Sequence, residues 1–220
     1  MKHIKSLINK IRIKYIWLLG NKRNIKSEGL KGNTLKYNKC IIKKLNIKIQ
    51  GENNTIIIDD STHLLNSKIY ISGNNNTIRI GKSCFIDGVT LRTEDDNNEI
   101  EIGNKTTFYG ESYLAAMEGT KITIGEDCMF AINVLFQTGD AHSIINLENQ
   151  RINFSKDIKI GNHVWVGTRV VCLKNTEVAD NCIIGANALV CGKHLKPNCA
   201  IGGVPAKVLK ENINWLRERI

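Results

Sequence analysis

The feature that most constrains the fold is a repeat whose length changes along the chain. Isoleucines recur every 22 residues, each followed by Asp or Gly, at Ile58, Ile80, Ile102 and Ile124. Further along, aliphatic residues or cysteine recur every six residues, at Ile160, Val166, Cys172, Val178, Ile184 and Val190. Such periods are typical of stacked supersecondary units, in which each unit packs only on its neighbours.

A six-residue period predicts a short strand followed by a bend. Three such steps make a triangular coil of about 18 residues, and coils stacked about 4.8 Å apart pair as parallel strands. The longer units then carry about four extra residues at one corner, which we place in the Asn-containing turns because Asn tolerates left-handed backbone conformations. Cys84 and Cys128 would lie two coils apart, about 9–10 Å, so they should be free thiols.

The repeat predicts one elongated domain with distinct ends. We expect a β-helix over residues 45–210, a basic helical or capping region over 1–44, and a short helix over 211–220. The inward series breaks at about 131–157, which is predicted to leave the coils as a loop, and loops on rigid scaffolds often carry function. The predicted fold is all-β, a parallel β-helix with an excursion loop and short terminal helices.

The formal charge of +10 on these 220 residues is concentrated at the start of the chain. Residues 1–50 hold 14 Lys or Arg and one Glu, whereas residues 51–155 hold 7 basic and 15 acidic residues. The acidic centre and an aromatic content of 6% argue against a nucleic-acid partner. The basic residues 1–50 could contact an anionic membrane or polymer, or could form a capping helix with a solvated basic face.

Composition also gives expectations for the cellular location of the protein, the state of its cysteines and metal binding. No stretch approaches about 18 uninterrupted apolar residues and no early apolar run suits a signal peptide, so we expect a cytoplasmic protein whose membrane contact, if any, is peripheral. The seven cysteines form no CxxC pair and should be reduced and mostly buried. No metal is predicted.

Two stretches carry a resemblance to a known family. The run IGNHVWVGTRVVCLKNTEVADNCIIGANALV at 160–190 and GGVPAKVLK at 202–210 resemble the hexapeptide-repeat acyltransferases of left-handed parallel β-helix fold. The closer branch contains galactoside, maltose, xenobiotic and surface-polysaccharide O-acetyltransferases, including those of polysialic acid. The resemblance implies acetyl transfer from acetyl-CoA to a hydroxyl of a sugar or bacterial surface polysaccharide. It also implies a homotrimer with acetyl-CoA between neighbouring β-helices.

The chemistry implied by this resemblance needs a general base, because a sugar hydroxyl is a poor nucleophile. His142, in the predicted loop, matches the catalytic histidine of the family. Trp165 matches the tryptophan coil near the oxyanion and should point outward, since a triangular coil has little room for indole. His163 is a weaker candidate that would shape the groove wall. Asp140 could orient His142, contact the acceptor or lie in solvent.

The resemblance also assigns the two substrates by position. Thr168, after Gly167, matches a contact to the pantetheine arm, and the small Ala186 allows close approach. The Thr-Lys pair of the family is altered here to Cys191-Gly-Lys193, where Lys193 can still reach a phosphate. The basic nucleotide contacts correspond to Lys207 and Lys210. The predicted acceptor residues are polar or aromatic coil positions, namely Tyr109, Glu111, Ser112 and Asn133, together with Asp140.

Two other functions fit parts of the sequence. A γ-type carbonic anhydrase is similar in fold but needs three histidines around zinc, and only His142 and His163 lie in a suitable part of the chain. A non-enzymatic β-helical scaffold would bind no CoA and would leave the motifs of residues 160–210 without a role. The acetyltransferase is therefore the preferred prediction.

Overall fold

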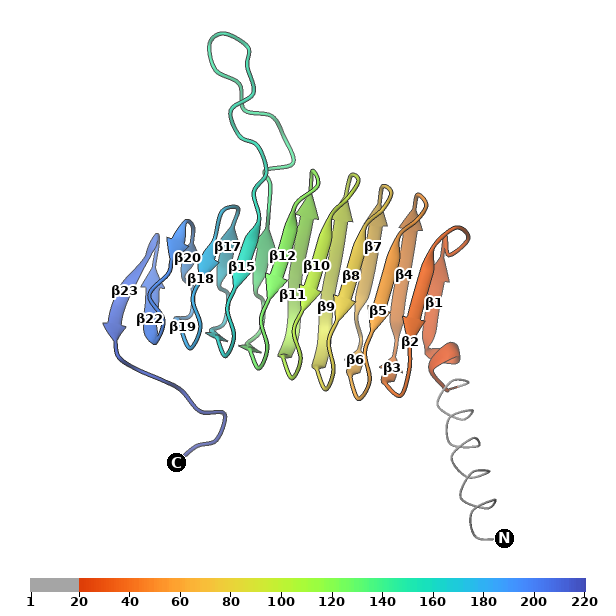
Figure 1. The fold of residues 1–220 in the computed structure, drawn as a ribbon, viewed down its shortest axis with the longest axis horizontal. Helices are drawn as coiled ribbons and strands as arrows, with labels where there is room; N and C mark the ends of the chain where they lie inside the picture. The colour runs from red at the N-terminus through yellow and green to blue at the C-terminus, as the bar shows by residue number, and fades with distance from the viewer. Residues whose placement is uncertain (1–19) are drawn as a thin grey trace.

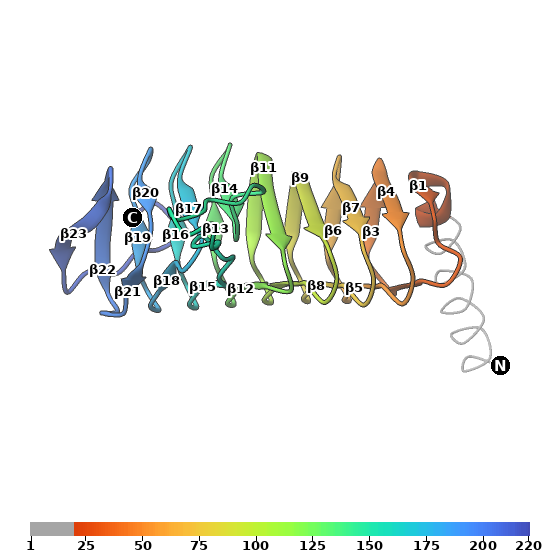
Figure 2. The same ribbon diagram turned by 90° about the horizontal axis from the view of Figure 1, so that it is seen from above.

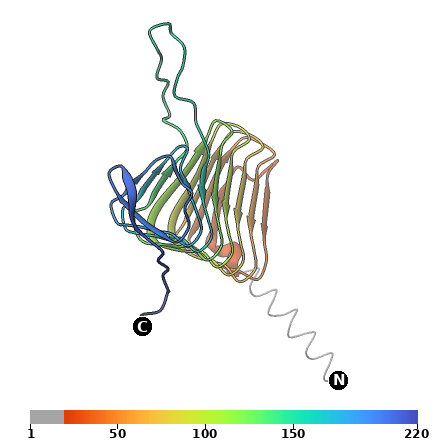
Figure 3. The same cartoon turned by 60° about the vertical axis from the view of Figure 1, so that its left-hand side comes forward.

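A computed structural model describes residues 20–220 of the chain. They form a triangular prism of stacked coils, with one loop and the C-terminal tail leaving it on opposite sides (Figures 1 and 3). The third face alone is an eight-stranded ladder, so the prism has eight coils. Neighbouring coils pair in parallel throughout, and this confirms the predicted parallel β-helix.

The strands fall into three ladders, which we call the first, second and third faces. The first face comprises β3 (Ile41–Lys43), β6 (His63–Leu65), the start of β9 (Phe85–Glu94), the start of β11 (Thr107–Met117), β13 (Met129–Phe130), β16 (Trp165–Val166), β19 (Ile183–Ile184) and β22 (Cys199–Gly203). The second comprises β1 (Ile25–Glu28), β4 (Leu45–Gln50), β7 (Lys68–Ser72), the ends of β9 and β11, β14 (Leu135–Gln137), β17 (Val171–Leu173) and β20 (Leu189–Val190). The third comprises β2 (Thr34–Tyr37), β5 (Thr55–Ile58), β8 (Thr77–Ile80), β10 (Glu99–Ile102), β12 (Lys121–Ile124), β15 (Ile158–Ile160), β18 (Glu177–Val178) and β21 (Lys193–His194). A last strand, β23 (Ala206–Glu211), pairs antiparallel with β22 and ends the prism (Figure 2).

Corners separate these faces, and we number them by the coil that begins at β15. Corner 1 comprises residues 161–164, between the third and first faces. Corner 2 comprises residues 167–170, between the first and second faces. Corner 3 comprises residues 174–176, between the second and third faces. Equivalent positions in the other coils carry the same corner number.

The core is built from columns of stacked aliphatic side chains. One column on the third face continues from Leu35 through five successive isoleucines, all fully buried: Ile56, Ile78, Ile100, Ile122 and Ile158. Each buried side chain of this size stabilises the fold by about 1.5–3 kcal/mol relative to exposure. β-Branched residues suit such columns because they pack well on a pleated surface.

The extra residues of the 22-residue coils lie at corner 3, as predicted. Asn54, Asn76 and Asn98 are buried there and form a ladder along the prism. The Asn76 Nδ2 donates to Asn54 Oδ1 at 3.1 Å, and Asn98 Nδ2 donates to Asn76 Oδ1 at 3.0 Å. The preceding asparagines supply the left-handed turn, for example Asn75 with φ of 57°. All seven cysteines are free, including Cys84 and Cys128.

The structure corrects the predicted start of the coils and the predicted C-terminal helix. The coils begin at Ile25 rather than at residue 45, because residues 25–43 already form strands β1 to β3 that pair with the next coil. The predicted N-terminal amphipathic segment lies outside the described residues, apart from a helical turn at 20–24. Residues 212–220 contain no helix; this short tail is extended and is held by side-chain contacts to the prism.

The excursion loop is also shorter than predicted. It starts after Gln137, not at residue 131, because Phe130 and Phe136 keep the six-residue step and remain buried in the core. The Phe130 ring stacks on Phe108 with centroids 4.0 Å apart and meets the Phe136 ring edge-on. The loop of residues 138–157 therefore replaces one corner 3 turn.

No helix within residues 20–220 is both long and apolar enough to span a membrane.

Candidate active site

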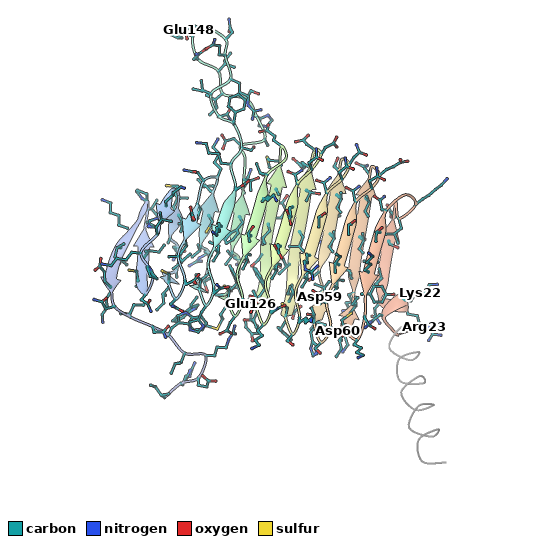
Figure 4. The ribbon with its side chains drawn as sticks, viewed as in Figure 1. Lys22, Arg23, Asp59, Asp60, Glu126 and Glu148 are labelled. Carbon is teal, nitrogen blue, oxygen red and sulfur yellow. The ribbon has the colours of Figure 1, made fainter. Side chains whose placement is uncertain are left out.

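The 138–157 loop carries His142 and projects from corner 3 as a long hairpin. Glu148 marks its tip (Figure 4). The His142 side chain is exposed, while its backbone is fixed because Asn153 Nδ2 donates to the His142 carbonyl at 2.7 Å. The predicted base thus stands on an anchored part of the loop with its imidazole in solvent.

Two clusters tie the base of this loop to the prism. Asp140 accepts hydrogen bonds from Lys174 and from Asn153, and these hold the pKa of Asp140 below its usual value. Glu118 accepts a hydrogen bond from Ser155 at 2.6 Å and pairs with Arg151 at 2.7 Å. The partners of the Asp140 carboxylate are therefore Lys174 and Asn153 rather than the His142 ring, so this carboxylate holds the loop.

Trp165 lies on β16 with 39% of its surface exposed, so its predicted outward orientation is confirmed. Two residues later the chain packs very tightly against the next coil. A methyl group at Gly167 would lie 2.7 Å from the Ala186 nitrogen and 2.9 Å from the Ile184 oxygen. Thr168 is joined to the same coil, because its carbonyl accepts from Asn187 N at 2.9 Å. The structure brings Trp165, Gly167, Thr168 and Ala186 together near corner 2.

Apart from Asp140, which lies at the base of the loop, the predicted acceptor residues lie along or beside the same corner. A groove of about 570 Å³ contains Glu111, Ser112 and Asn133 in its lining. Tyr109 lies beside it on the first face, 49% exposed, with its ring 5.5 Å from that of Phe85. Asn133 and Thr168 belong to successive coils, so the acceptor residues of this groove and the cofactor residues Thr168 and Ala186 line one edge of the prism. His142 is on a loop that leaves from another edge.

The predicted phosphate contacts are divided between two faces. Lys207 and Lys210 lie on β23, opposite Gly202 and Ala200 of β22, and extend the first face. Lys193 lies on the third face and pairs with Glu177 at 3.2 Å. Cys191 is exposed at corner 3. Lys207 and Lys210 can therefore act together, whereas Lys193 is separated from them in one protomer.

His163 occupies corner 1 and is fully engaged. Its Nδ1 lies 2.9 Å from Asp127 Oδ2, its Nε2 lies 3.1 Å from the Trp215 carbonyl, and its ring stacks on that of Trp215 at 4.2 Å. Burial would raise the pKa of Asp127, but hydrogen bonds from His163 and Arg217 outweigh it and lower that pKa. Because both ring nitrogens of His163 are occupied, neither is available to deprotonate a sugar.

Sequence reasoning missed several residues that shape this region. Lys174 and Asn153 fix the loop, while Trp215 and Arg217 fix corner 1. An isolated tryptophan in a charged tail was the available signal for Trp215. Nothing in the repeat indicated Lys174 or Asn153, since both act through contacts between segments far apart in sequence. Within residues 20–220 no group of three or more His, Cys, Asp or Glu is arranged to hold a metal.

Comparison with known proteins places this geometry in a family. No protein-family model matches the chain. The polysialic acid O-acetyltransferase of Neisseria meningitidis is 37% identical over 110 residues, covering 50% of this chain and 51% of the relative. That of Escherichia coli O1:K1 is 35% identical over 109 residues, covering 49% of this chain and 35% of the relative. The chain thus spans about half, or less, of the length of the curated relatives it matches.

Solved structures extend the likeness over nearly the whole chain. The polysialic acid O-acetyltransferase OatWY superposes with a TM-score of 0.81 and 34% identity, covering 89% of this chain and 92% of that one. The polySia-specific acetyltransferase NeuO superposes with a TM-score of 0.76 and 30% identity, covering 88% and 82%. With its stacked parallel coils and the tryptophan and GAN motifs along one edge, the chain belongs to the hexapeptide-repeat acyltransferases of left-handed β-helix fold.

Proposed function

We propose that this protein transfers an acetyl group from acetyl-CoA to a hydroxyl of a bacterial surface polysaccharide. In this reaction His142 takes the hydroxyl proton as the sugar oxygen attacks the thioester carbon. The C–S bond then breaks, the acetyl ester forms, and the CoA thiolate takes up a proton. Family membership and the edge that joins the acceptor groove to Trp165, Thr168 and Ala186 support this proposal.

The cofactor-side residues suit a CoA arm. Ala186 is exposed and small, and the tight packing at Gly167 keeps two coils close, so an extended chain can lie against the corner without a side chain in its way. Lys207 and Lys210 project from the terminal hairpin, where they can meet phosphates. We place acetyl-CoA along corner 2 for these reasons.

The observation that carries the proposal furthest is the separation of His142 from this edge. His142 belongs to a loop on corner 3, whereas the acceptor groove and Thr168 lie at corner 2. A site that contains all of them would be completed by a second copy of the chain, which favours an oligomer such as the homotrimer implied by the resemblance. The loop also exposes a cluster of apolar side chains, as a surface covered by a partner does, at Ile144, Ile145, Leu147, Ile152 and Phe154.

The acceptor proposed first is an acidic sialic acid polymer. The relatives named above are polysialic acid O-acetyltransferases, and residues 25–50 of this chain, which include its first coil, are strongly basic. Lys48, Tyr70 and Arg92 line a shallow groove of about 230 Å³ on the second face, where a negatively charged polymer would be attracted. Galactosides are the neutral alternative, since a galactoside O-acetyltransferase of Escherichia coli K12 is 32% identical over 103 residues.

The test offers acetyl-CoA with polysialic acid, galactosides and maltose, and follows thiol release together with the mass gain of the acceptor. His142→Ala should lower turnover by at least about 100-fold, the usual contribution of a general base, and should leave acetyl-CoA affinity nearly unchanged. His63→Ala, several coils away on β6, is the matched control and should retain turnover. Retained turnover in His142→Ala would refute the assignment of the base.

Subunit mixing tests the shared site. Ala186→Trp should block the cofactor edge while leaving His142 intact. If one subunit supplies His142 and its neighbour supplies corner 2, oligomers assembled from inactive His142→Ala and inactive Ala186→Trp chains will regain part of the activity. Mixtures that remain inactive after confirmed co-assembly would argue for a site within one chain.

A further inference from the structure

The last nine residues form a strap across corner 1, which we define as residues 212–220. The strap turns back from β23 beneath the prism (Figure 1). Its hydrogen bonds reach several coils: Ile213 N donates to Asn198 O at 3.0 Å, Trp215 Nε1 to His163 O at 2.9 Å, and Arg217 to Lys105 O at 3.3 Å. The strap therefore fixes several coils to each other along one edge.

Trp215 and His163 contact each other through stacked rings and two hydrogen bonds. The two rings are nearly parallel, with an interplanar angle of 7°, and Trp215 is only 5% exposed. Each residue also bonds the backbone carbonyl of the other, because Trp215 Nε1 donates to His163 O and His163 Nε2 lies 3.1 Å from Trp215 O. Stacking combined with two reciprocal hydrogen bonds defines the position of the indole more tightly than hydrophobic burial alone.

Arg217 secures the strap at a second point. Its Nε donates to Asp127 Oδ1 at 3.0 Å, and one terminal nitrogen donates to Thr107 Oγ1 at 3.0 Å. The other terminal nitrogen donates to the Cys128 carbonyl at 3.0 Å, and the guanidinium lies 5.7 Å from the Trp215 ring centroid. A planar guanidinium satisfies these divergent acceptors together, which a lysine ammonium cannot do.

The strap also meets the candidate active site. The Trp215 ring lies 6.2 Å from the Trp165 ring at an angle of 48°, which is within the range of favourable aromatic pairs. Trp165 projects from a two-residue strand and is 39% exposed. One side of the exposed Trp165 indole therefore packs against Trp215, whose position is fixed by the contacts of the strap.

We propose that the strap positions Trp165, with Trp215 as the positioning residue and Arg217 as its anchor. The contribution to catalysis rests on the proposed function, whereas the ordering of Trp165 does not. Trp215 acts through Trp165 and is not assigned any contact with substrate. Loss of Trp215 should leave the prism folded and let the Trp165 indole adopt several orientations.

The first measurement is ¹⁹F NMR of the full chain labelled with 5-fluorotryptophan, with the Trp165 resonance assigned from Trp165→Phe. Trp215→Ala and Arg217→Ala should shift and broaden the Trp165 resonance, and Trp215→Phe should largely restore it. Leu216→Ala alters a 59% exposed neighbour in the same strap and is the matched control. A Trp165 resonance that is unchanged in folded Trp215→Ala would overturn the proposal, whether or not the protein turns over.

The second measurement is the Kd of acetyl-CoA by calorimetry, with kcat and KM measured on the same variants. Trp215→Ala should weaken binding about three- to tenfold, as expected from the loss of one aromatic pair. Trp215→Phe and Leu216→Ala should stay close to wild type. If Trp215→Ala melts earlier but binds acetyl-CoA and turns over normally, the strap is only structural. If wild type shows no acetyl transfer to any acceptor, the proposed function fails instead, and the NMR result still decides the positioning.

Discussion

The two halves of the prism repeat the same triangular coil with different numbers of residues per coil. From β4 to β12 the coils take 22 residues and contain the longest strands, β9 with 10 residues and β11 with 11. From β15 the coils take 18 residues, except that the last takes 16 or 17, and most strands have two or three. The long coils bury an asparagine ladder at corner 3, whereas glycines lie against neighbouring backbone in both halves, for example Gly73 in the long coils and Gly167 in the short ones. The long coils therefore differ from the short ones by a buried polar ladder rather than by the closeness of their backbones.

The change between the halves occurs at one corner. The asparagine ladder ends at Thr120, whose backbone nitrogen donates to Asn98 Oδ1 at 3.1 Å. The Thr120 hydroxyl then donates to Thr138 Oγ1 at 2.7 Å, and Thr138 is the first residue of the loop that carries His142. The scaffold thus ends where the functional loop begins, so the loop is rooted in the most regular part of the molecule.

The largest expected effect on stability comes from breaking the ladder. Asn76→Ala removes the acceptor of the buried Asn98 backbone nitrogen and the donor to Asp95 O. Each buried polar group left unsatisfied costs about 1–3 kcal/mol, so the free energy of unfolding should fall by about 3 kcal/mol. Chemical denaturation of the full chain measures this change.

Asn74→Ala is the matched control at the same corner. Asn74 also bonds across coils, to Glu52 N at 2.9 Å and to Asp96, but its side chain is exposed. Water can replace those bonds, so the cost should be below about 1 kcal/mol. Equal losses for the two variants would show that burial of the ladder has no special role.

Much of this scaffold could be predicted from the sequence, because each coil obeys local rules. The column of Ile78, Ile100 and Ile122 and the turns at Asn75 recur at a fixed spacing, so a period read from the sequence gives strands, corners and inward faces. The first coil and the C-terminal tail do not follow this repeat. The first coil lacks the Asn-Asn turn, and the tail is held by Trp215 through contacts with His163, which lies 52 residues earlier in the chain.

The candidate site was predictable only in part, for a related reason. Trp165, Gly167 and Thr168 stand in a local motif, and their common edge follows from the coil geometry. Contacts such as Lys174 with Asp140 join the loop to a coil 34 residues away, and no period in the sequence encodes that pairing. Under the proposed function, the relation between His142 and corner 2 would depend on assembly, which a single sequence does not specify.

The second prediction contrasts two glycines in the short coils. Gly167→Ala would place a methyl group 2.7 Å from the Ala186 nitrogen, whereas Gly185→Ala would meet nothing closer than 3.5 Å, at Ile201 O. Overpacking of this kind costs about 1–3 kcal/mol, so Gly167→Ala should lower stability by that amount and separate the coils beside Thr168. Gly185→Ala should stay within about 0.5 kcal/mol of wild type. Thermal melts of both variants decide this, and a reversed order would contradict close packing at Gly167.

The smallest expected effect concerns thiol chemistry, where the exposed Cys191 differs from the buried thiols of both halves. Burial raises the pKa of Cys40 and Cys84 to about 11 and that of Cys128 to about 12, so these thiols in the long coils should stay protonated and unreactive at neutral pH. Cys191, in the short coils, is exposed. Mass spectrometry after brief treatment with a maleimide should find one fast label, and Cys191→Ser should abolish it.

If Cys191 contacts the cofactor as its motif position implies, saturating CoA will slow that label without changing the fold. Fast labelling of a buried cysteine in the folded chain would instead show that the long coils open more readily than their ladder implies.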